Sequence, residues 1–339
     1  MVISVVIPTV AGSSTIADLL VHLSTFDMGL PPSSYEVIAV VDGGEPFSFP
    51  SEINGVQITV TSNQRYRGAA GARNTGALLA KGDYLLFLDD DTFPSEGALA
   101  VIVEEFRRLG PRSALGITVN QLLYDPSYME QLRKTLIGHF FLSEYTKWHF
   151  YTPHSIPASF LCSGAMAMSR SFFFSVGGFR ELPPQHWHGV GLYISGEDTE
   201  LSHRLLQEGG RLFFIGGIRF IARERQPLTP KIAFHRRFIE GYARRILWEQ
   251  MGKPPNRGYK TLTDSPFLDK ILSSKYGLIM GYFAWFLYII SNFAFRLTRG
   301  KLAWHHPLLL ALYAFEYAGM RFAEEKIEQN ILSQQQWIK

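Results

Sequence analysis

Hydrophobic and polar positions along the first 120 residues follow two alternating patterns. Short apolar runs rich in β-branched residues, typical of buried strands, are separated by segments whose apolar residues recur every three or four positions, typical of helices. The predicted strands are residues 2–7, 37–41, 56–61, 84–88 and 114–119. The predicted helices are residues 13–26, 71–80 and 94–109, the last opened by Pro94 because proline suits a first helical turn. This alternation favours an α/β fold with a mostly parallel central sheet flanked by helices.

The second half of the chain is less regular. The pattern predicts strands at 165–168, 212–215 and 219–222, and helices at about 198–208 and 230–251. After a polar linker around Pro254, residues 276–295 carry no charge. As a helix this stretch is about 30 Å long, enough to cross a bilayer core. Residues 307–319 form a shorter apolar stretch interrupted by Glu316. The two stretches predict either one membrane span or a pair of helices lying in the membrane interface, and a buried helical hairpin is the alternative.

Charge and cysteine content indicate which surface the protein binds and in which compartment it lies. The net charge of +3 is too small to indicate nucleic-acid binding, so we expect no nucleic-acid partner. Residues 223–257, however, contain nine Lys/Arg and three Glu directly before the most apolar part of the chain, which suits phosphates and an anionic membrane surface. The single cysteine, Cys162, excludes an intrachain disulfide and fits a reducing compartment, and the N-terminus has no signal-peptide pattern.

Two acidic clusters stand at predicted element boundaries. Asp89, Asp90 and Asp91 follow an apolar strand, and three adjacent carboxylates repel one another unless a cation such as Mg²⁺ or Mn²⁺ neutralises them. Glu197 and Asp198 begin a predicted helix, where a carboxylate can accept a proton from a hydroxyl nucleophile. Each cluster also has a structural explanation, because acids are common at helix starts.

The segment RYRGAAGARNTG, residues 65–76, is rich in small residues that let the backbone approach a ligand closely, and Arg73 within it can meet a phosphate. Packing of a helix onto the sheet explains the same small residues. The segment lacks the G-x-G-x-x-G spacing, and the turn after the first strand reads TVAGSS, so a dinucleotide oxidoreductase is disfavoured. A nucleotidyltransferase is disfavoured too, since it usually needs a Gly-rich, basic loop directly after that strand.

Taken in order, these motifs resemble the family 2 glycosyltransferases, which have the GT-A fold. The resemblance covers about residues 2–215 through SVVIPTV, VVDGG, GAAGARNTG, GDYLLFLDDDT, CSGAMAMSR, VGGFRE and GEDTELSHRL. It implies that Pro8 and Thr9 lie at the nucleotide edge of the first strand and that Asp42 contacts the donor base. It also places Arg73 beneath the donor and gives donor contacts to Asp89 and Asp90.

The same resemblance assigns the chemistry. Asp91 would bind a divalent metal, Mn²⁺ or Mg²⁺, and His235 matches a position where some relatives add a histidine ligand. Gly164 and Glu197 would line the acceptor or sugar pocket, and Asp198 would be the general base. The Q-x-x-R-W motif of processive polysaccharide synthases is absent, which favours a single-addition enzyme.

The resemblance implies an inverting glycosyltransferase that moves a sugar from a nucleotide-sugar donor, by family default a UDP-sugar, to a hydroxyl of a glycan or lipid-linked acceptor in cell-surface polysaccharide or glycolipid synthesis. We expect a GT-A catalytic domain at 1–225, a basic helix and linker at 226–269, and an apolar, membrane-associated helical segment at 270–339. By the positive-inside rule the catalytic domain would face the cytoplasm at the cell membrane. The alternatives are a non-catalytic nucleotide-sugar-binding protein and a membrane scaffold.

Overall fold

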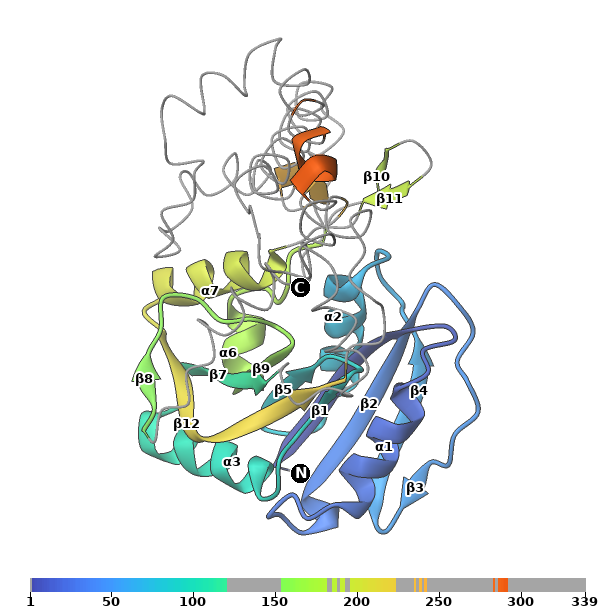
Figure 1. Ribbon diagram of the computed structural model, residues 1–339. Helices are drawn as coiled ribbons and strands as arrows, with labels where there is room; N and C mark the ends of the chain where they lie inside the picture. Colours follow the sequence, from blue (N-terminus) through green and yellow to red (C-terminus); the bar gives the residue numbers. More distant parts are fainter. Residues whose placement is uncertain are drawn as a thin grey trace.

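The computed structural model describes residues 2–120, 154–181, 185–187, 190–192 and 196–223, with isolated positions at 235, 238–239, 241–242, 283 and 286–291. Its main feature is one large sheet with helices on both faces (Figure 1). The strands are β1 (Ile3–Val10), β2 (Tyr35–Asp42), β3 (Glu52–Ile53), β4 (Val56–Ser62), β5 (Tyr84–Leu88), β6 (Thr92–Phe93), β7 (Ser113–Asn120), β8 (Ile156–Pro157), β9 (Ala165–Ser169) and β12 (Arg211–Ala222). The helices are α1 (Ile16–Thr25), the short 3₁₀ helix η1 (Pro32–Ser34), α2 (Ala69–Leu79), α3 (Ala98–Leu109), α6 (Arg170–Ser175) and α7 (Glu197–Gln207).

The sheet has the strand order β3-β4-β2-β1-β5-β9-β7-β12-β6, with β8 paired to β12 off this path. A separate small hairpin pairs β10 (Gln185–Trp187) with β11 (Val190–Leu192). The strands β4, β2, β1 and β5 pair in parallel, as do β7 and β12, while β9 runs antiparallel between β5 and β7. The prediction of a mostly parallel sheet therefore holds for its main strands, and β9 makes the whole sheet mixed.

Two apolar layers hold the helices to the sheet. Alternate residues of β1 point to opposite faces, as the pleat of a strand requires. Val5 packs with the apolar faces of α1 and α3, including Leu19 and Phe106, and its neighbour Val6 packs with α2, α6 and α7 on the other face. This burial explains why the β1 sequence is apolar at nearly every position, as expected for a strand covered on both sides.

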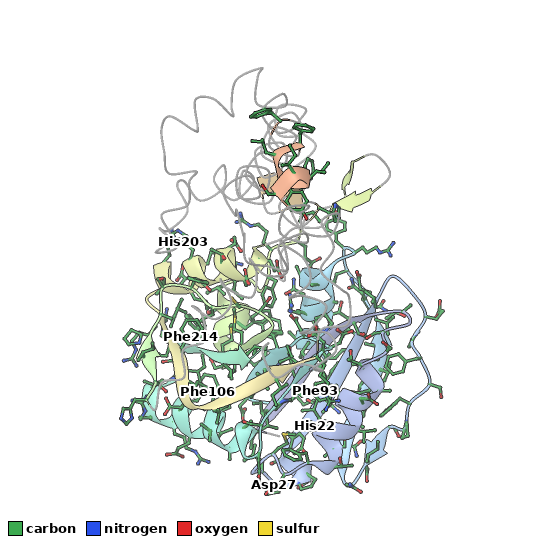
Figure 2. The ribbon with its side chains drawn as sticks, viewed as in Figure 1. His22, Asp27, Phe93, Phe106, His203 and Phe214 are labelled. Atoms are coloured by element: carbon green, nitrogen blue, oxygen red, sulfur yellow. The ribbon has the colours of Figure 1, made fainter. Side chains whose placement is uncertain are left out.

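Several predicted boundaries move for identifiable reasons. The helix predicted from Pro94 begins at Ala98, because Thr92 and Phe93 pair with the end of β12 and Gly97 has a left-handed backbone conformation. The strands predicted at 212–215 and 219–222 are one strand, β12, whose register shifts between Ile215 and Arg219. Figure 2 places Phe93 beside His22, and the two rings meet edge to face with their centroids 5.4 Å apart.

The predicted C-terminal elements fall largely outside the described residues. This applies to the helix at 230–251, the linker, most of 276–295, and 307–319. Within the part of the chain that the structure describes, no helix is long and apolar enough to span a membrane. The proposed boundaries at 225 and 270 remain predictions.

Candidate functional site

The ends of three parallel strands and the start of an antiparallel one meet at one edge of the sheet. Val10 at the end of β1 is in register with Asp42 at the end of β2. The chain leaves β5 at Leu88, which is paired with Ala165 at the start of β9. The amide of Asp89 donates to the carbonyl of Gly164, 3.0 Å away. Because ligands of open α/β sheets bind beyond the carboxyl ends of the strands, this edge is the candidate site.

Asp42 organises a turn at this edge. Its two carboxylate oxygens accept hydrogen bonds from Asn63 Nδ2 at 2.8 Å and from the amide of Gly68 at 2.9 Å. Gly43 follows with φ of +78°, a left-handed conformation that glycine adopts without a steric penalty. The exposed guanidinium of Arg67 lies directly against Gly43, because a Cβ built there would be 2.6 Å from Arg67 Nε. Arg67 thus brings a positive charge to the turn beside Asp42.

The side chain of Asn63 makes several of the hydrogen bonds that hold the loop carrying Arg67. Asn63 Oδ1 accepts from the amide of Arg65 at 3.0 Å and from Thr75 Oγ1 at 2.9 Å, while its Nδ2 also donates to the carbonyl of Tyr66 at 3.0 Å. These bonds join the end of β4 to α2. The Gly-rich segment singled out from the sequence is therefore a braced loop followed by a helix.

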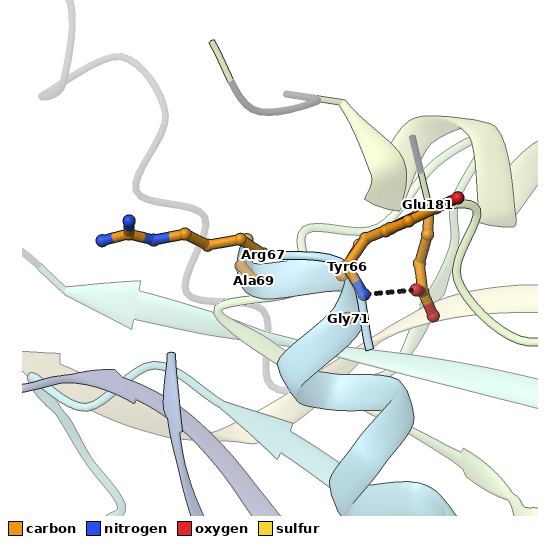
Figure 3. A pocket seen from close by; sticks show the side chains of 7 residues that line it. Tyr66, Arg67, Ala69, Gly71 and Glu181 are labelled. Carbon is orange, nitrogen blue, oxygen red and sulfur yellow. Dashed lines mark hydrogen bonds between the residues drawn. The ribbon is translucent and has the colours of Figure 1, made fainter. Parts of the chain in front are cut away.

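A shallow pocket lies at the start of α2 (Figure 3). It is lined by Tyr66, Arg67, Gly68, Ala69, Ala70, Gly71 and Glu181. Glu181 is buried, accepts from the amide of Tyr66 at 3.3 Å and from Asn74 Nδ2 at 2.5 Å, and forms an ion pair with Arg65. Figure 3 shows Arg67 pointing away from Glu181. Since the protein supplies a carboxylate where the helix dipole favours negative charge, this pocket is not suited to a second anion.

The three strand-end acids are all half-buried at the candidate site. Thr9 Oγ1 donates to Asp90 Oδ2 at 2.6 Å, so the ends of β1 and β5 are joined by side chains. Asp91 is half-buried; its carbonyl accepts from the amide of Arg223 at 2.6 Å, and its Oδ1 accepts from Thr92 Oγ1 at 3.2 Å. The backbone of Asp91 is therefore held between the end of β5 and the end of β12.

Arg73 lies under this edge rather than on its surface. The residue is 3% exposed, and its two terminal nitrogens donate to Asp89 Oδ1 and to Glu197 Oε1, both at 2.8 Å. Burial alone would lower the pKa of Arg73, but the charges of Asp89 and Glu197 outweigh it and raise that pKa. The guanidinium therefore stays charged between the two acidic clusters.

The second cluster begins α7. Gly196 has φ of +86° and precedes Glu197, the first helical residue. Asp198 is half-buried; its Oδ1 accepts from the amide of Thr199 at 2.6 Å, and its Oδ2 accepts from the amide of Ser163 at 3.4 Å. Burial and the neighbouring Asp198 raise the pKa of Glu197, and the ion pair with Arg73 offsets part of that rise. The two adjacent acids thus have different environments.

The structure brings most of the predicted site residues together. Pro8, Thr9 and Asp42 lie at the ends of β1 and β2, Asp89 to Asp91 follow β5, and Gly164 touches Asp89, whose Oδ2 is 2.7 Å from a Cβ built at the glycine. Arg73 connects this group, through Asp89, to Glu197, which precedes Asp198 on α7. The roles predicted for these residues remain predictions.

The metal prediction rests on fewer contacts. His235 is a half-buried helical residue among isolated described positions. Among the described residues, no three His, Cys, Asp or Glu side chains form a cluster that could hold an ion by themselves. A half-buried Asp91 fits a different arrangement, in which a hard cation takes one or two protein carboxylates and completes its shell with substrate phosphates and water. The ligand role of Asp91 and that of His235 therefore stay predictions.

Sequence reasoning missed three contributors to this site. Arg67 stood inside the singled-out Gly-rich segment, but Arg73 received attention because it sits on the predicted helix. Ser163 belongs to the motif CSGAMAMSR, in which only Gly164 had a predicted role, and Glu181 belongs to VGGFRE, in which no residue had one. In each motif a polar residue recurs close to a glycine, and this pattern could have pointed to these three residues. The pattern does not distinguish a residue that contacts a ligand from one that only bonds within the protein.

Comparisons with known proteins give one family and two glycosyltransferase relatives. The model described as "Glycosyl transferase family 2" matches residues 4–174, half of the chain. An uncharacterised glycosyltransferase of Haemophilus influenzae is 35% identical over 89 residues, which are 26% of this chain and 29% of that protein. A putative polypeptide N-acetylgalactosaminyltransferase 13 of Drosophila melanogaster is 29% identical over 166 residues, 46% of this chain and 27% of that protein. The chain thus spans less than a third of the length of these curated relatives.

Among solved structures, one similar chain is the mannosyltransferase PcManGT from Pyrobaculum calidifontis in complex with GDP-Man and Mn²⁺. It is 15% identical, with a TM-score of 0.49, and the match covers 97% of this chain and 87% of that one.

Proposed function

Since the chain belongs to Glycosyl transferase family 2, we propose that it transfers a sugar from a nucleotide-sugar donor to a hydroxyl acceptor with inversion at the anomeric carbon. The observation that carries this proposal is the convergence at one sheet edge of Thr9, Asp42 and the acids after β5. Arg73 connects these acids to Glu197, the neighbour of Asp198 at the start of α7. An acidic donor site and a separate acidic base are what the reaction requires.

The donor would lie across the ends of β1, β2 and β5. The turn at Asp42 and Gly43 would receive the nucleoside, and Thr9 and Asp90, which already bond to each other, would border it. We add Arg67 to the donor residues, because its exposed guanidinium lies against Gly43 and can meet a phosphate of the donor. UDP is the nucleotide expected by default, and a glycan or lipid-linked hydroxyl is the expected acceptor.

A divalent metal, Mn²⁺ or Mg²⁺, would be held by Asp91 together with the diphosphate. When bound, it offsets the negative charge that develops on the leaving nucleoside diphosphate. The protein's part is to hold the Asp91 backbone in place through the amide of Arg223 and to leave its carboxylate half-buried at the site. His235 remains a candidate additional ligand.

Asp198 is the proposed general base. The acceptor oxygen would attack the anomeric carbon while its proton passes to the Asp198 carboxylate. The bond from the anomeric carbon to the phosphate oxygen would break on the opposite face, and its electron pair would leave with the nucleoside diphosphate. The hydrogen bonds from Ser163 and Thr199 orient Asp198 for this transfer.

We also propose that the protein acts at a membrane, with the catalytic domain on the cytoplasmic side. Helical residues near the C-terminus support this: Phe283, Phe286, Ile289 and Ile290 are 45–58% exposed, whereas Tyr288 and Ser291 are buried. A helix that turns its largest apolar side chains outward suits lipid. The excess of basic residues in 223–257 suits anionic headgroups.

Vesicle flotation tests this membrane proposal. Full-length protein should float with vesicles of phosphatidylserine and phosphatidylcholine, and Phe286→Glu should reduce the floating fraction, whereas the exposed-site control Leu78→Glu on α2 should not. A full-length protein that stays with the soluble fraction in the presence of these vesicles would contradict the proposal.

The alternatives are a nucleotide-sugar-binding protein without turnover and a membrane scaffold. A thermal-shift panel of UDP and GDP, each with and without Mn²⁺, separates the scaffold from the other two, because a ligand that binds the folded state raises its apparent stability. We expect a shift with one diphosphate that depends on Mn²⁺. Release of that diphosphate from the matching sugar donor then separates the enzyme from the binding protein. Absence of any shift would contradict the proposed function.

A further inference from the structure

The arginine on α2 joins two parts of the candidate site, the turn after β5 and the start of α7. Arg73 comes from near the middle of α2, Asp89 from the turn after β5, and Glu197 from the first position of α7. The two acids accept from different terminal nitrogens of one guanidinium. A planar guanidinium holds such partners at a fixed separation and angle, which a lysine ammonium does not.

The surroundings restrict both acids further. Gly164 leaves room for Asp89 that a larger residue would not, since a Cβ there would lie 2.7 Å from Asp89 Oδ2. The preceding residue, Ser163, donates its hydroxyl to Glu197 Oε1 at 3.4 Å and its amide to Asp198 Oδ2 at 3.4 Å. One turn of two residues therefore touches Asp89 on one side and both α7 acids on the other.

The bonding pattern of Arg73 leaves no terminal nitrogen unpaired for direct donor binding. The residue is 3% exposed, the ring of Phe179 lies 5.5 Å from its central carbon, and its Nε, although buried, has no hydrogen-bond partner among the described residues. A buried Nε without a hydrogen-bond partner costs free energy, which the charge-assisted bonds of the same guanidinium offset. The contacts that it does make are the two acids.

We propose that Arg73 is a positioning residue that fixes the separation between the donor-side acid Asp89 and the helix start that carries Asp198. This proposal rests on the proposed function. Arg73 would act through Asp89 and Glu197 and would contact neither donor nor acceptor. The ion pairs of Arg73 with Asp89 and Glu197 would then fix the distance between the donor sugar and the base, Asp198.

A second buried ion pair on α7 supplies a matched control. Arg204 donates to both oxygens of the buried Glu200 at 2.6 Å and to the carbonyl of Gly178 at 2.7 Å, which attaches α7 to the loop after α6. Arg204 follows Glu197 by two helical turns, and its guanidinium donates to Glu200 and to the carbonyls of Val176 and Gly178. We expect Arg204→Lys to weaken the attachment of α7 to the loop after α6, while Arg73 keeps its bonds to Asp89 and Glu197.

The experiment compares wild type, Arg73→Lys and Arg204→Lys in the full-length protein. Affinity for UDP and for GDP is measured by calorimetry with Mn²⁺, and turnover is measured as release of nucleoside diphosphate from UDP-GlcNAc, UDP-glucose and GDP-mannose. We expect Arg73→Lys to lower turnover about 10²-fold, the scale of an ångström-sized misplacement, while diphosphate affinity changes by less than about threefold. Arg204→Lys should change turnover by less than about threefold.

Three results would overturn the proposal, and they are distinguishable. Equal turnover in the two lysine variants would give Arg73 a structural role only. A loss of diphosphate affinity in Arg73→Lys that matches its loss of turnover would make Arg73 a donor ligand. A wild-type protein that binds neither UDP nor GDP with Mn²⁺ would overturn the proposed function, and the positioning role with it.

Discussion

The two acidic clusters of the candidate site are held in opposite ways. Asp89, Asp90 and Asp91 follow a strand, are half-buried, and reach the surface, with the Asp89 side chain 46% exposed. Glu197 at the start of α7 is buried and bonded to Arg73, and only its neighbour Asp198 is half-buried. The first cluster leaves carboxylate oxygens at a surface where a ligand can reach them, whereas the second uses one acid to fix the other.

Glu197 and Asp198 are adjacent in sequence, but only Glu197 is bonded to Arg73. Burial and the Asp198 charge raise the pKa of Glu197, and Arg73 counteracts both. Asp198 accepts from the backbone amides of Ser163 and Thr199, and it shares the start of α7 with Glu197, which the ion pair holds. All three strand-end acids are half-buried. We therefore expect them to act together on the donor diphosphate and its metal. The following predictions test this contrast.

The largest effect is expected at the strand end. Asp91→Ala should lower turnover by about 10³-fold or more, because several kcal/mol of charge stabilisation at the leaving group would be lost with the metal. Mn²⁺-dependent UDP binding should weaken in parallel, and calorimetry with and without Mn²⁺ measures it. Asp18→Ala, at an exposed position of α1, is the charge-matched control. Intact Mn²⁺-dependent binding in Asp91→Ala would show that the metal assignment is wrong.

A smaller effect with a different signature is expected at the helix start. Asp198→Asn should reduce turnover by about 10²-fold or more, the usual scale for loss of a general base. Diphosphate binding should be nearly unchanged, because Asp198 lies on the acceptor side of the bridge. Steady-state kinetics and calorimetry on the same preparation make the comparison. If binding and turnover fell together, Asp198 would belong with the donor acids and the contrast between the clusters would disappear.

Glu197→Gln should have the smallest effect on turnover, about tenfold, since an amide keeps one hydrogen bond to Arg73 but loses its charge assistance. Its effect on stability should depend on pH. The pKa of Glu197 is raised above its ordinary value of 4.5, so the folded state binds this proton more tightly than the unfolded state. Its contribution to stability is present below pH 4.5 and is lost as the pH rises through the raised pKa.

Denaturant unfolding of wild type and Glu197→Gln across this pH range checks the sign. The unfolding free energy of wild type minus that of the variant should decrease as the pH rises from 4.5, because glutamine does not titrate. A difference that increases with pH would mean that Arg73 dominates and lowers the pKa of Glu197.

The sheet was largely predictable from the sequence because its strands are buried on both faces. Continuous apolar runs such as Tyr84–Leu88 appear at the expected positions. The elements that sequence patterns missed or misplaced depend on distant partners. Phe93 pairs in β6 with Ile221 of β12, and α6, from Arg170 to Ser175, is too short for a helical period to be read. Pro94 suggested a helix start, but strand pairing just before it moved the helix to Ala98.

The sequence predicted which acidic residues belong to the candidate site, but it did not predict the hydrogen bonds and ion pairs between them. Acids at strand and helix boundaries are visible in a sequence, so Asp89, Asp91 and Asp198 could be selected. The bond from Arg73 to Glu197 joins residues 124 positions apart and has no local signature. Arg67 shares its loop with Arg65, and only the fold shows that Arg65 pairs with the buried Glu181 while Arg67 faces Gly43.

A crystal structure of the full-length protein with UDP and Mn²⁺ tests the division between the clusters most directly. Anomalous scattering locates the manganese ion independently of the protein density. The account predicts manganese bonded to Asp91 and to the diphosphate, with Arg73 still bridging Asp89 and Glu197, and with Asp198 facing the acceptor side and bound to no metal. Manganese bonded to Asp198, or a diphosphate bonded to Arg73 in place of Asp89, would contradict it.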